Sequence, residues 1–505
     1  MPGSASGTAR ISATSRTRWW ALAVVSLATL MSYLDNNVTN VAIPTIQRNL
    51  HLSVTGLEWI VSSYLLVFAG LLLIGGRLAD VFGRRRVFLV GLAIFTLSSL
   101  AAGLAGSGGV LIGARAVQGL GAALMTPATL AIVTATFTDV RERAAAIGIW
   151  GAVGALGLAI GPVIGGVISQ HVHWGWIFLI NVPLGVITFA LALPFVAESR
   201  AESASRRLDL PGLASSALAL FALTYGLIDG HDRGWTSPII TTAFAVAAVA
   251  FAVFLVVESR SRQPMVPLQM FRSREFSGGT TTMMIWGFSI LGIYFFTSLY
   301  LQEILGFSPS KAGLSFVPMA LFLAVFAAVA PRVMSVLGGH RTVALGMALM
   351  VAGLVLFARI GADASFASLM PGFLLFGAGA GLTNVPLTNI VLDAAPPSRA
   401  GVASALFNDS REVAGLLGVT VIGAVLRTRQ GDALHAGVAA PQAFLDGYHT
   451  GLWVTIALMA AGIVLSYLAL RPRAAARDAA RAAEPGLPAT LDTAREESGE
   501  AEPAR

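Results

Sequence analysis

The stretch WWALAVVSLATLMSYLDNNVTNVAIP, residues 19–44, decides the fold, because it places an acid where a membrane span would have none. Residues 19–34 are almost all apolar, which at this length predicts a helix that crosses a membrane. At about 1.5 Å per residue, Asp35 lies roughly 24 Å along that helix from the tryptophan pair, within a hydrocarbon core about 30 Å thick. A carboxylate there is costly unless it is hydrated, paired or protonated, so Asp35 is a candidate functional residue.

The whole chain has the composition of an integral membrane protein. Of its 505 residues, 55% are hydrophobic and 12% are charged, and average soluble domains carry about twice that charged fraction. The chain has no cysteine, which excludes disulfides, thiolate catalysis and Cys-ligated metals. His171 and His173 have a metal-like spacing but no evident third ligand, so we expect neither a metal nor a cofactor. We attribute the net charge of +7 to arginines in cytoplasmic loops rather than to a nucleic-acid partner.

Apolar runs of suitable length predict an all-α membrane protein with fourteen transmembrane helices. Residues 1–18 are predicted to be a cytoplasmic tail. Residues 471–505, rich in Ala, Arg, Glu and Pro without apolar periodicity, are predicted to be a disordered cytoplasmic tail. The approximate spans are 19–43, 57–79, 86–106, 109–133, 144–169, 175–197, 209–229, 236–258, 276–302, 311–337, 340–360, 366–391, 399–427 and 448–470.

The basic residues set the expected orientation. With the N-terminus in the cytoplasm, most of the 33 Lys and Arg residues fall in cytoplasmic segments, as the positive-inside rule requires. Both termini are therefore expected to be cytoplasmic. The segments assigned to the outside hold only Arg48, Arg233, Lys311, Arg359, Arg427 and Arg429.

Short patterns in the first half of the chain recur weakly in the second half. Residues 331–338, at the end of the tenth span, match residues 76–83 after the second span, and Arg399 matches Arg143. Two six-span halves with a helix pair inserted between them explain these matches, and such halves are typical of transporters that work by alternating access. The expected units are an N-terminal bundle, an inserted pair with cytoplasmic linkers and a C-terminal bundle, at residues 19–197, 198–275 and 276–470.

Five motifs resemble the major facilitator superfamily. The stretch GRLADVFGRR at 76–85 is similar to the signature between the second and third spans of that superfamily, and RAVQGLG at 115–121 is similar to its span 4 motif. Residues 154–166 resemble the span 5 motif that is associated with antiporters rather than symporters. Residues 34–44 and 176–183 resemble the fourteen-span drug:proton antiporter branch. Five motifs in this order, over residues 19–470, make the resemblance specific.

This resemblance implies a function. A member of the branch would export a lipophilic, cationic or amphipathic drug or antibiotic in exchange for a proton, by alternating access, and would confer resistance. It would lie in the bacterial cell membrane and act as a monomer, with protons, the drug and the lipid bilayer as its partners and no nucleic acid. Asn36, Asn37, Gly175 and Ser335 depart from the usual pattern, which leaves the substrate open.

Asp35 and Arg115 form the candidate proton-coupling site. Arg115 lies about six residues into the fourth span, which enters from outside, so its depth is similar to that of Asp35. An intramembrane arginine needs a partner, and Asp35 would supply one in competition with a proton. The alternatives are an acid tied to a neighbouring helix for structural reasons, and an arginine bonded only to backbone carbonyls and polar groups of the first span.

The loop after the second span holds a candidate conformational latch. An acid at a helix end that faces basic residues can hold two bundles together in one state and release them in another. Anchoring of the loop by its positive charge alone is the alternative. The latch residues are Gly76, Asp80, Gly83, Arg84 and Arg85.

The fifth span has small residues three and four positions apart on one face. Such a face permits close approach by another helix, and packing alone would explain it. The resemblance assigns this face to an antiporter motif, made of Gly154, Gly157, Gly161, Pro162, Gly165 and Gly166.

Polar and aromatic residues of several spans are candidates for a substrate pocket. The thirteenth span carries the densest polar cluster, which is either a second protonation site or a network that links the two halves. Aromatic rings could bind a flat or cationic drug by stacking and cation–π attraction, with ordinary packing as the alternative. The candidates are Asn36, Tyr64, Trp286, Asn384, Asn408, Asp409, Arg411 and Glu412.

Other classes of function fit the sequence less well. A nucleotide-driven pump would need a P-loop, and the only lysine, Lys311, follows a serine. An intramembrane enzyme would need a nucleophile with a base, or a metal set, inside the spans, so we do not expect an enzyme. The main alternative is a proton-coupled importer of a small nutrient or metabolite, and the span 5 pattern favours the exporter.

Overall fold

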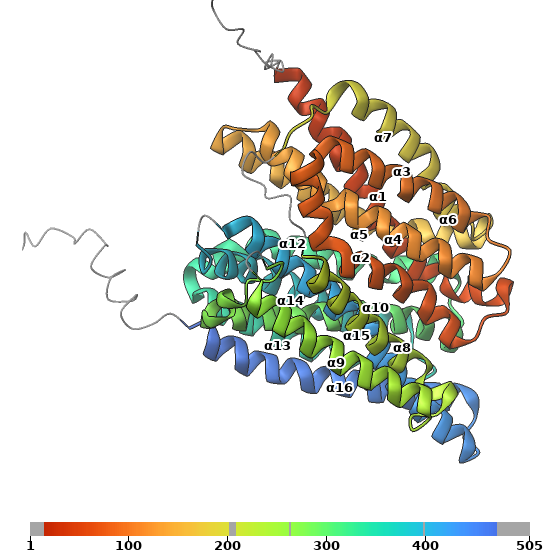
Figure 1. Ribbon diagram of the computed structural model, residues 1–505. Coiled ribbons are helices and arrows are strands. Elements are labelled where there is room, and N and C mark those ends of the chain that lie inside the picture. The colour runs from red at the N-terminus through yellow and green to blue at the C-terminus, as the bar shows by residue number, and fades with distance from the viewer. Residues whose placement is uncertain (1–14, 201–208, 262–263, 397–398, 472–505) are drawn as a thin grey trace, which may run out of the picture.

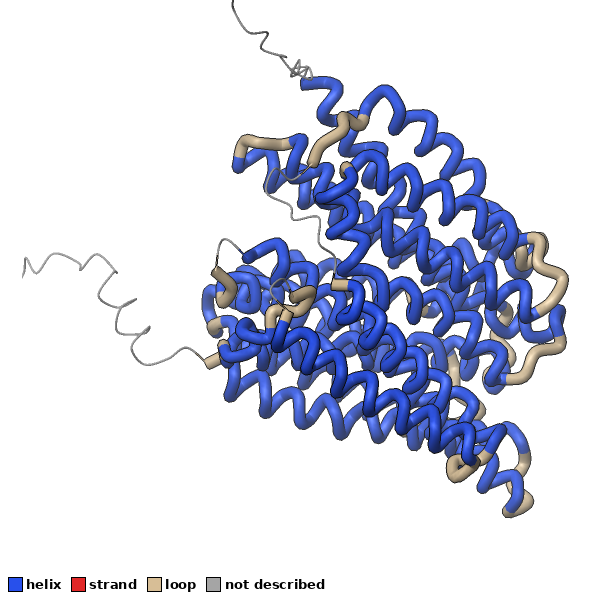
Figure 2. The backbone as a smooth tube through the Cα atoms, in the orientation of Figure 1, coloured by secondary structure: helices blue, strands red, loops and turns tan. Residues whose placement is uncertain are grey.

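The computed structural model describes residues 15–200, 209–261, 264–396 and 399–471. Within these residues the regular structure is helical and no strand is present (Figure 2). The first helix begins at Ser15, so part of the predicted N-terminal tail is helical instead. This helix therefore begins four residues before the predicted start of the first span at residue 19. The predicted disordered tail lies outside the described residues, except for Arg471.

Each of the fourteen predicted spans has a helical counterpart, with ends that differ from the prediction by several residues. The predicted sixth span is divided into α6 and α7, and the tenth into α11 and α12. A π-helix at Tyr300–Ile304 continues α10. In chain order the α-helices are α1 (Ser15–Leu50), α2 (Val54–Phe82), α3 (Arg84–Gly103), α4 (Gly108–Thr136), α5 (Val140–His171), α6 (Trp176–Leu179), α7 (Asn181–Phe195), α8 (Leu210–Arg233), α9 (Pro238–Arg260), α10 (Arg274–Leu299), α11 (Pro309–Ser315), α12 (Val317–Leu337), α13 (Gly339–Phe357), α14 (Phe366–Asp393), α15 (Ala400–His435) and α16 (Ala440–Ala469).

Twelve helical segments among the described residues are long and apolar enough to cross a membrane by length and composition. The other two predicted spans are α1 and α15, each 36 residues long, in which clusters of polar residues interrupt the apolar pattern. The structure also extends one predicted span. The thirteenth span was predicted to end at residue 427, with Arg427 assigned to an outer segment, whereas α15 continues to His435 and only 5% of the surface of Arg427 is exposed.

The helices form two six-helix bundles and an inserted pair, as the sequence predicts. Helices α1–α7 pack together, most extensively through α2 with α4, α3 with α4 and α1 with α5. Helices α10–α16 pack together through α13 with α14, α12 with α14 and α10 with α15 (Figure 1). Helix α8 packs against α9 and also contacts α2 and α15, so the inserted pair touches both bundles. The residue limits predicted for these units remain a prediction.

The ends of the helices define two faces of the molecule. We call the end that carries the start of α1 and the end of α16 the terminal face, and the other end the opposite face. On the opposite face the bundles are bonded to each other, and Figure 1 shows their ribbons diverging toward the terminal face. The bonds include those from Ser298 Oγ to Asn40 O (3.0 Å), Gln302 Nε2 to Val41 O (2.9 Å), Ser310 N to Gln170 Oε1 (3.1 Å), and the ion pair of Arg48 with Glu303 (3.4 Å).

Helix α5 packs its glycine face against α1. A Cβ atom at Gly165 would lie 2.6 Å from the carbonyl oxygen of Val38, and one at Gly161 would lie 2.7 Å from Cβ of Asn37. The glycines therefore let the two backbones touch, which is how helices pack closely in lipid. At Gly166, α5 instead meets the backbone of Pro309 in α11, so this helix contacts both bundles through small residues.

Gly165→Leu is therefore expected to lower the stability of the protein by about 1–3 kcal/mol, because the added side chain would force α1 and α5 apart. Thermal unfolding in detergent would measure the loss. Gly148→Leu is the matched control, since a Cβ at that position of α5 meets nothing within 4 Å. An equal loss in both variants would show that helix propensity, rather than close packing, is responsible.

Candidate functional site

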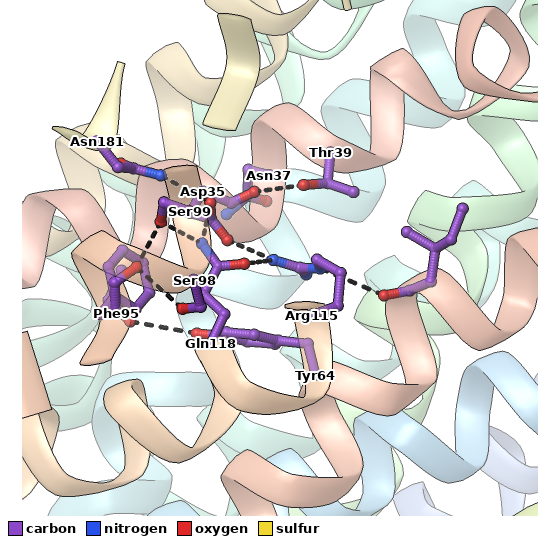
Figure 3. Close-up of polar contacts among 12 residues, drawn as sticks. Asp35, Asn37, Thr39, Tyr64, Phe95, Ser98, Ser99, Arg115, Gln118 and Asn181 are labelled. Carbon is purple, nitrogen blue, oxygen red and sulfur yellow. Dashed lines mark hydrogen bonds and ion pairs between the residues drawn. The ribbon is translucent and has the colours of Figure 1, made fainter. Parts of the chain in front are cut away.

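Asp35 lies inside the N-terminal bundle, with 1% of its surface exposed. Arg115 Nη1 of α4 donates to its Oδ2 at 2.5 Å, and Gln118 Nε2 and Asn181 Nδ2 each donate to its Oδ1 at 2.8 Å (Figure 3). The structure thus brings together the two residues singled out from the sequence, and adds two amides. We call Asp35, Arg115, Gln118 and Asn181 the Asp35 cluster.

Arg115 is fully buried and has partners on three sides. Its Nη1 also donates to Gln118 Oε1 at 2.7 Å, and its Nε donates to the carbonyl oxygen of Ile60 in α2 at 3.2 Å. The guanidinium carbon lies 4.3 Å from the centre of the Tyr64 ring, which is a cation–π distance. Arg115 therefore has a carboxylate partner as well as a backbone partner.

The Asp35 cluster has two electrostatic states within reach of one proton. A buried ion pair is favourable only when further hydrogen bonds support its charges. The amides of Gln118 and Asn181 donate to the Asp35 carboxylate, and Arg115 donates to Gln118 Oε1 and to the Ile60 carbonyl oxygen. Protonation of Asp35 would remove its charge and leave Arg115 with Gln118 Oε1, the Ile60 carbonyl and the Tyr64 ring. The cluster can therefore hold either a carboxylate paired with arginine or a neutral acid beside a cation.

Gln118 and Asn181 were missed from the sequence as site residues. Both lie within motifs that were recognised, at 115–121 and 176–183, but an uncharged amide costs less in a membrane than a charge and so gives a weaker signal. Gln118 is further fixed by donating to Ser99 Oγ of α3 at 2.8 Å. The position of Asn181 depends on the packing of α7 against α1, which no local pattern indicates.

Asp80 and Arg84 form an ion pair at the terminal face, with Arg84 Nη2 3.0 Å from Asp80 Oδ1. Between them α2 ends at Phe82, and the next residue, Gly83, has a φ of +114°, a conformation that residues with a side chain rarely adopt. Gly76 packs against α4, where a Cβ would lie 3.5 Å from Cβ of Pro127. These latch residues are held by contacts within the N-terminal bundle.

Arg85 is also bonded within its own bundle. Its guanidinium donates to the carbonyl oxygen of Leu193 at 2.6 Å, and its backbone N–H donates to Glu198 Oε1 at 3.2 Å. Glu198 lies 3.7 Å from Arg86 as well. The sequence did not single out this glutamate, which follows α7 and reaches the turn between α2 and α3.

Of the predicted pocket residues, Tyr64 is 1% exposed and lies with the Asp35 cluster. Asn36 is half-buried on α1, and its Oδ1 has no hydrogen-bond partner among the described residues. In the C-terminal bundle, Trp286 Nε1 donates to the carbonyl oxygen of Ala380 at 3.3 Å, and Asn384 is half-buried. Tyr64 and Asn36 therefore lie in the N-terminal bundle, and Trp286 and Asn384 in the C-terminal bundle.

The polar residues of α15 lie close together on that helix. Arg411 Nη2 is 2.6 Å from Glu412 Oε1, and Asn408 Nδ2 donates to the carbonyl oxygen of Ser404 at 2.9 Å. Asp409 is 9% exposed, and its Oδ1 has no hydrogen-bond partner among the described residues. Arg411 also interacts with Tyr33 of α1, which places this cluster where the two bundles meet.

Comparison with known proteins identifies the family. The model of the Major Facilitator Superfamily matches residues 25–419. The chain belongs to this superfamily. This superfamily member is 38% identical over 415 residues to the tetracenomycin C resistance and export protein of Streptomyces glaucescens, which covers 82% of this chain and 77% of that protein. It is 34% identical over 452 residues, 89% of each chain, to the puromycin resistance protein of Streptomyces alboniger.

The fold of this superfamily member is also that of solved transporters. A POT family transporter in complex with 5-aminolevulinic acid superposes with a TM-score of 0.66 at 16% identity, over 89% of this chain and 96% of that one. The predicted superfamily and the predicted fold class are therefore confirmed. The protein is a multi-pass membrane transporter.

Proposed function

We propose that this protein exports lipophilic, cationic or amphipathic drugs or antibiotics in exchange for inward-moving protons, by alternating access. It acts as a monomer in the bacterial cell membrane with both termini in the cytoplasm, so that the terminal face is cytoplasmic. The observation that carries the proposal is the burial of Asp35 against Arg115. Relatives named for resistance to tetracenomycin C and to puromycin support the substrate class.

The Asp35 cluster supplies the coupling. In the outward-open state Asp35 takes up a proton from outside, which releases Arg115 from the ion pair. In the inward-open state Arg115 returns to the carboxylate and the proton leaves to the cytoplasm. A proton that moves inward across 100 mV releases roughly 2.3 kcal/mol, which biases a conformational equilibrium about fifty-fold.

The remaining residues have roles that follow from their places. Asp409 and Glu412 on α15 would attract the positive charge of a cationic drug where the bundles meet, with Asn36 on the facing helix α1. Asp80 with Arg84 and Arg85 forms the cytoplasmic latch, which is bonded within its own bundle in this conformation. The glycine face of α5 gives α1 and α11 a smooth surface to pack against.

Accumulation of a fluorescent lipophilic cation by cells tests this function. Cells that produce the protein are expected to accumulate several-fold less of it than cells with an empty vector, and a protonophore should remove the difference. A proton-coupled importer would instead raise accumulation. A difference that persists after the gradient has been collapsed would exclude proton coupling.

A further inference from the structure

Besides the pair of Asp35 and Arg115, which lies within one bundle, the structure has a buried ion pair between the two bundles, near the opposite face. Glu58 of α2 is fully buried, Arg427 of α15 has a 5% exposed side chain, and Arg427 Nη1 lies 2.6 Å from Glu58 Oε1. The two atoms are not aligned as a hydrogen bond, and Glu58 Oε2 has no hydrogen-bond partner among the described residues. Asp35 accepts three hydrogen bonds, whereas the charge of Glu58 is balanced by one close contact.

Arg427 belongs to α15 and pairs with Glu58 of α2, and the inserted helix α8 binds it as well. Arg427 Nη2 donates to the carbonyl oxygens of Leu227 and Ile228 in α8, at 3.3 Å and 2.8 Å. These bonds fix the guanidinium at the junction of α2, α8 and α15. These two bonds place the Arg427 guanidinium beside Glu58 independently of the Glu58 carboxylate.

Helix α8 is also bonded to the start of α2. Asp229 Oδ2 accepts from Trp59 Nε1 at 2.9 Å, and Asp232 Oδ2 accepts from Thr55 Oγ1 at 2.6 Å. Helix α8 therefore keeps its place beside α2 while its carbonyl oxygens hold a residue of the other bundle. The inserted pair is thereby part of the contact between the bundles.

Little space is left around the Glu58 carboxylate. Gly423 lies one turn before Arg427 on α15, and a Cβ atom there would collide with the Glu58 carboxylate. The fit of α15 against α2 therefore keeps the pair closely covered. Since the two residues belong to opposite bundles, an opening of this face must separate them, and each ion would then lose its partner.

The charged groups that face Glu58 come from two helices. Arg427 on α15 stabilises its charge, whereas Asp229 and Asp232 on α8 repel it. Arg233 pairs with Asp229 at 3.2 Å, and His231 of the same helix borders Gly431 of α15. When the bundles part, Glu58 would keep the two aspartates as neighbours and lose the arginine, so that binding a proton would relieve the repulsion.

We propose that Glu58 is a proton-binding gate residue on the extracellular side, with α8 as the helix that positions its partner Arg427. A proton from outside breaks the ion pair and lets the bundles part. The proton leaves again to the outside when the pair re-forms, so Glu58 sets the balance between conformations and transfers no net charge. This proposal rests on the orientation and the alternating access proposed above.

The absence of cysteine from the chain makes a direct test possible. Ser298→Cys places a thiol at the bundle contact, where Ser298 is fully buried and donates to the carbonyl oxygen of Asn40. A membrane-impermeant maleimide added outside the cells labels this thiol when the bundles part on that side. With Glu58→Gln in the same background, we expect labelling near pH 8 to be about tenfold faster or more, because a buried pair has been broken.

Acidification separates a proton-binding gate from a merely structural contact. We compare the labelling rate of the Glu58→Gln variant with that of its parent, which carries Ser298→Cys alone. Near pH 5.5 the ratio of these two rates should fall toward one, because acid also opens the parent by protonating Glu58. The ratio cancels the dependence of thiol reactivity on pH. A ratio that stays high at both pH values would make Glu58 a structural contact only, and a ratio of one at both would remove it from the gate.

Two further variants keep the test decisive. Glu303→Gln is the matched control, since it removes an ion pair across the same face whose partners are 42% and 60% exposed, and such pairs contribute little. If Glu58→Gln does not reach the membrane, Arg427→Gln should also label fast at both pH values, and slow labelling would contradict the gate. The assay needs no substrate, so its result is independent of whether the cells export a drug.

Discussion

Asp35→Asn is expected to abolish proton-driven export while the protein still reaches the membrane. Asparagine keeps the size of the side chain and can bond with the amides of Gln118 and Asn181, but it cannot bind and release a proton. The cluster would then have one electrostatic state instead of two. In inverted membrane vesicles with an acid interior, drug-dependent proton release should fall to the level of vesicles that lack the protein.

Asp363→Asn is the comparison for this variant. Asp363 lies on an exposed loop of the C-terminal bundle, so the same chemical change should leave exchange intact. Undiminished exchange by Asp35→Asn would remove Asp35 from the mechanism. Loss of exchange in both variants would mean that removing any carboxylate impairs the assay, and would not implicate the Asp35 cluster.

Arg115→Gln is expected to destabilise the N-terminal bundle by about 3–5 kcal/mol, because it leaves the Asp35 carboxylate buried without its cation. Thermal unfolding in detergent would measure this loss. The double variant Asp35→Asn with Arg115→Gln should recover most of the stability, since neither charge remains, but should recover no export. If the losses of the two single variants simply add in the double variant, the two residues do not stabilise each other.

The sequence was sufficient for the fold class and for one half of the candidate site. Span lengths and the positive-inside rule gave comparable depths for Asp35 and Arg115, and the structure brings these two residues together. Gln118 and Asn181 could not be found in the same way, because amides occur in membrane helices for many reasons. Their role appears only once α1, α4 and α7 are placed side by side.

The pair of Glu58 and Arg427 shows a second limit of the sequence. Glu58 lies at the start of the predicted second span, where an acid is unremarkable, and Arg427 lies at the predicted end of the thirteenth span, where an arginine is equally unremarkable. Their contact joins helices from opposite bundles and depends on α8, so it is a property of tertiary packing. Neither residue belongs to a motif of the superfamily that the sequence revealed.

The glycine contacts of helix α5 affect how the two bundles can move relative to each other. This helix meets α1 at Gly161 and Gly165 and α11 at Gly166, in each case through backbone atoms or short stems rather than interlocked side chains. The contact at Gly166 joins the two bundles through backbone atoms, so the bundles can pivot there without first separating interlocked side chains. Resistance to this pivot then falls mainly on the bonds between the bundles at the opposite face, from Ser298 and Gln302 to α1 and between Glu58 and Arg427.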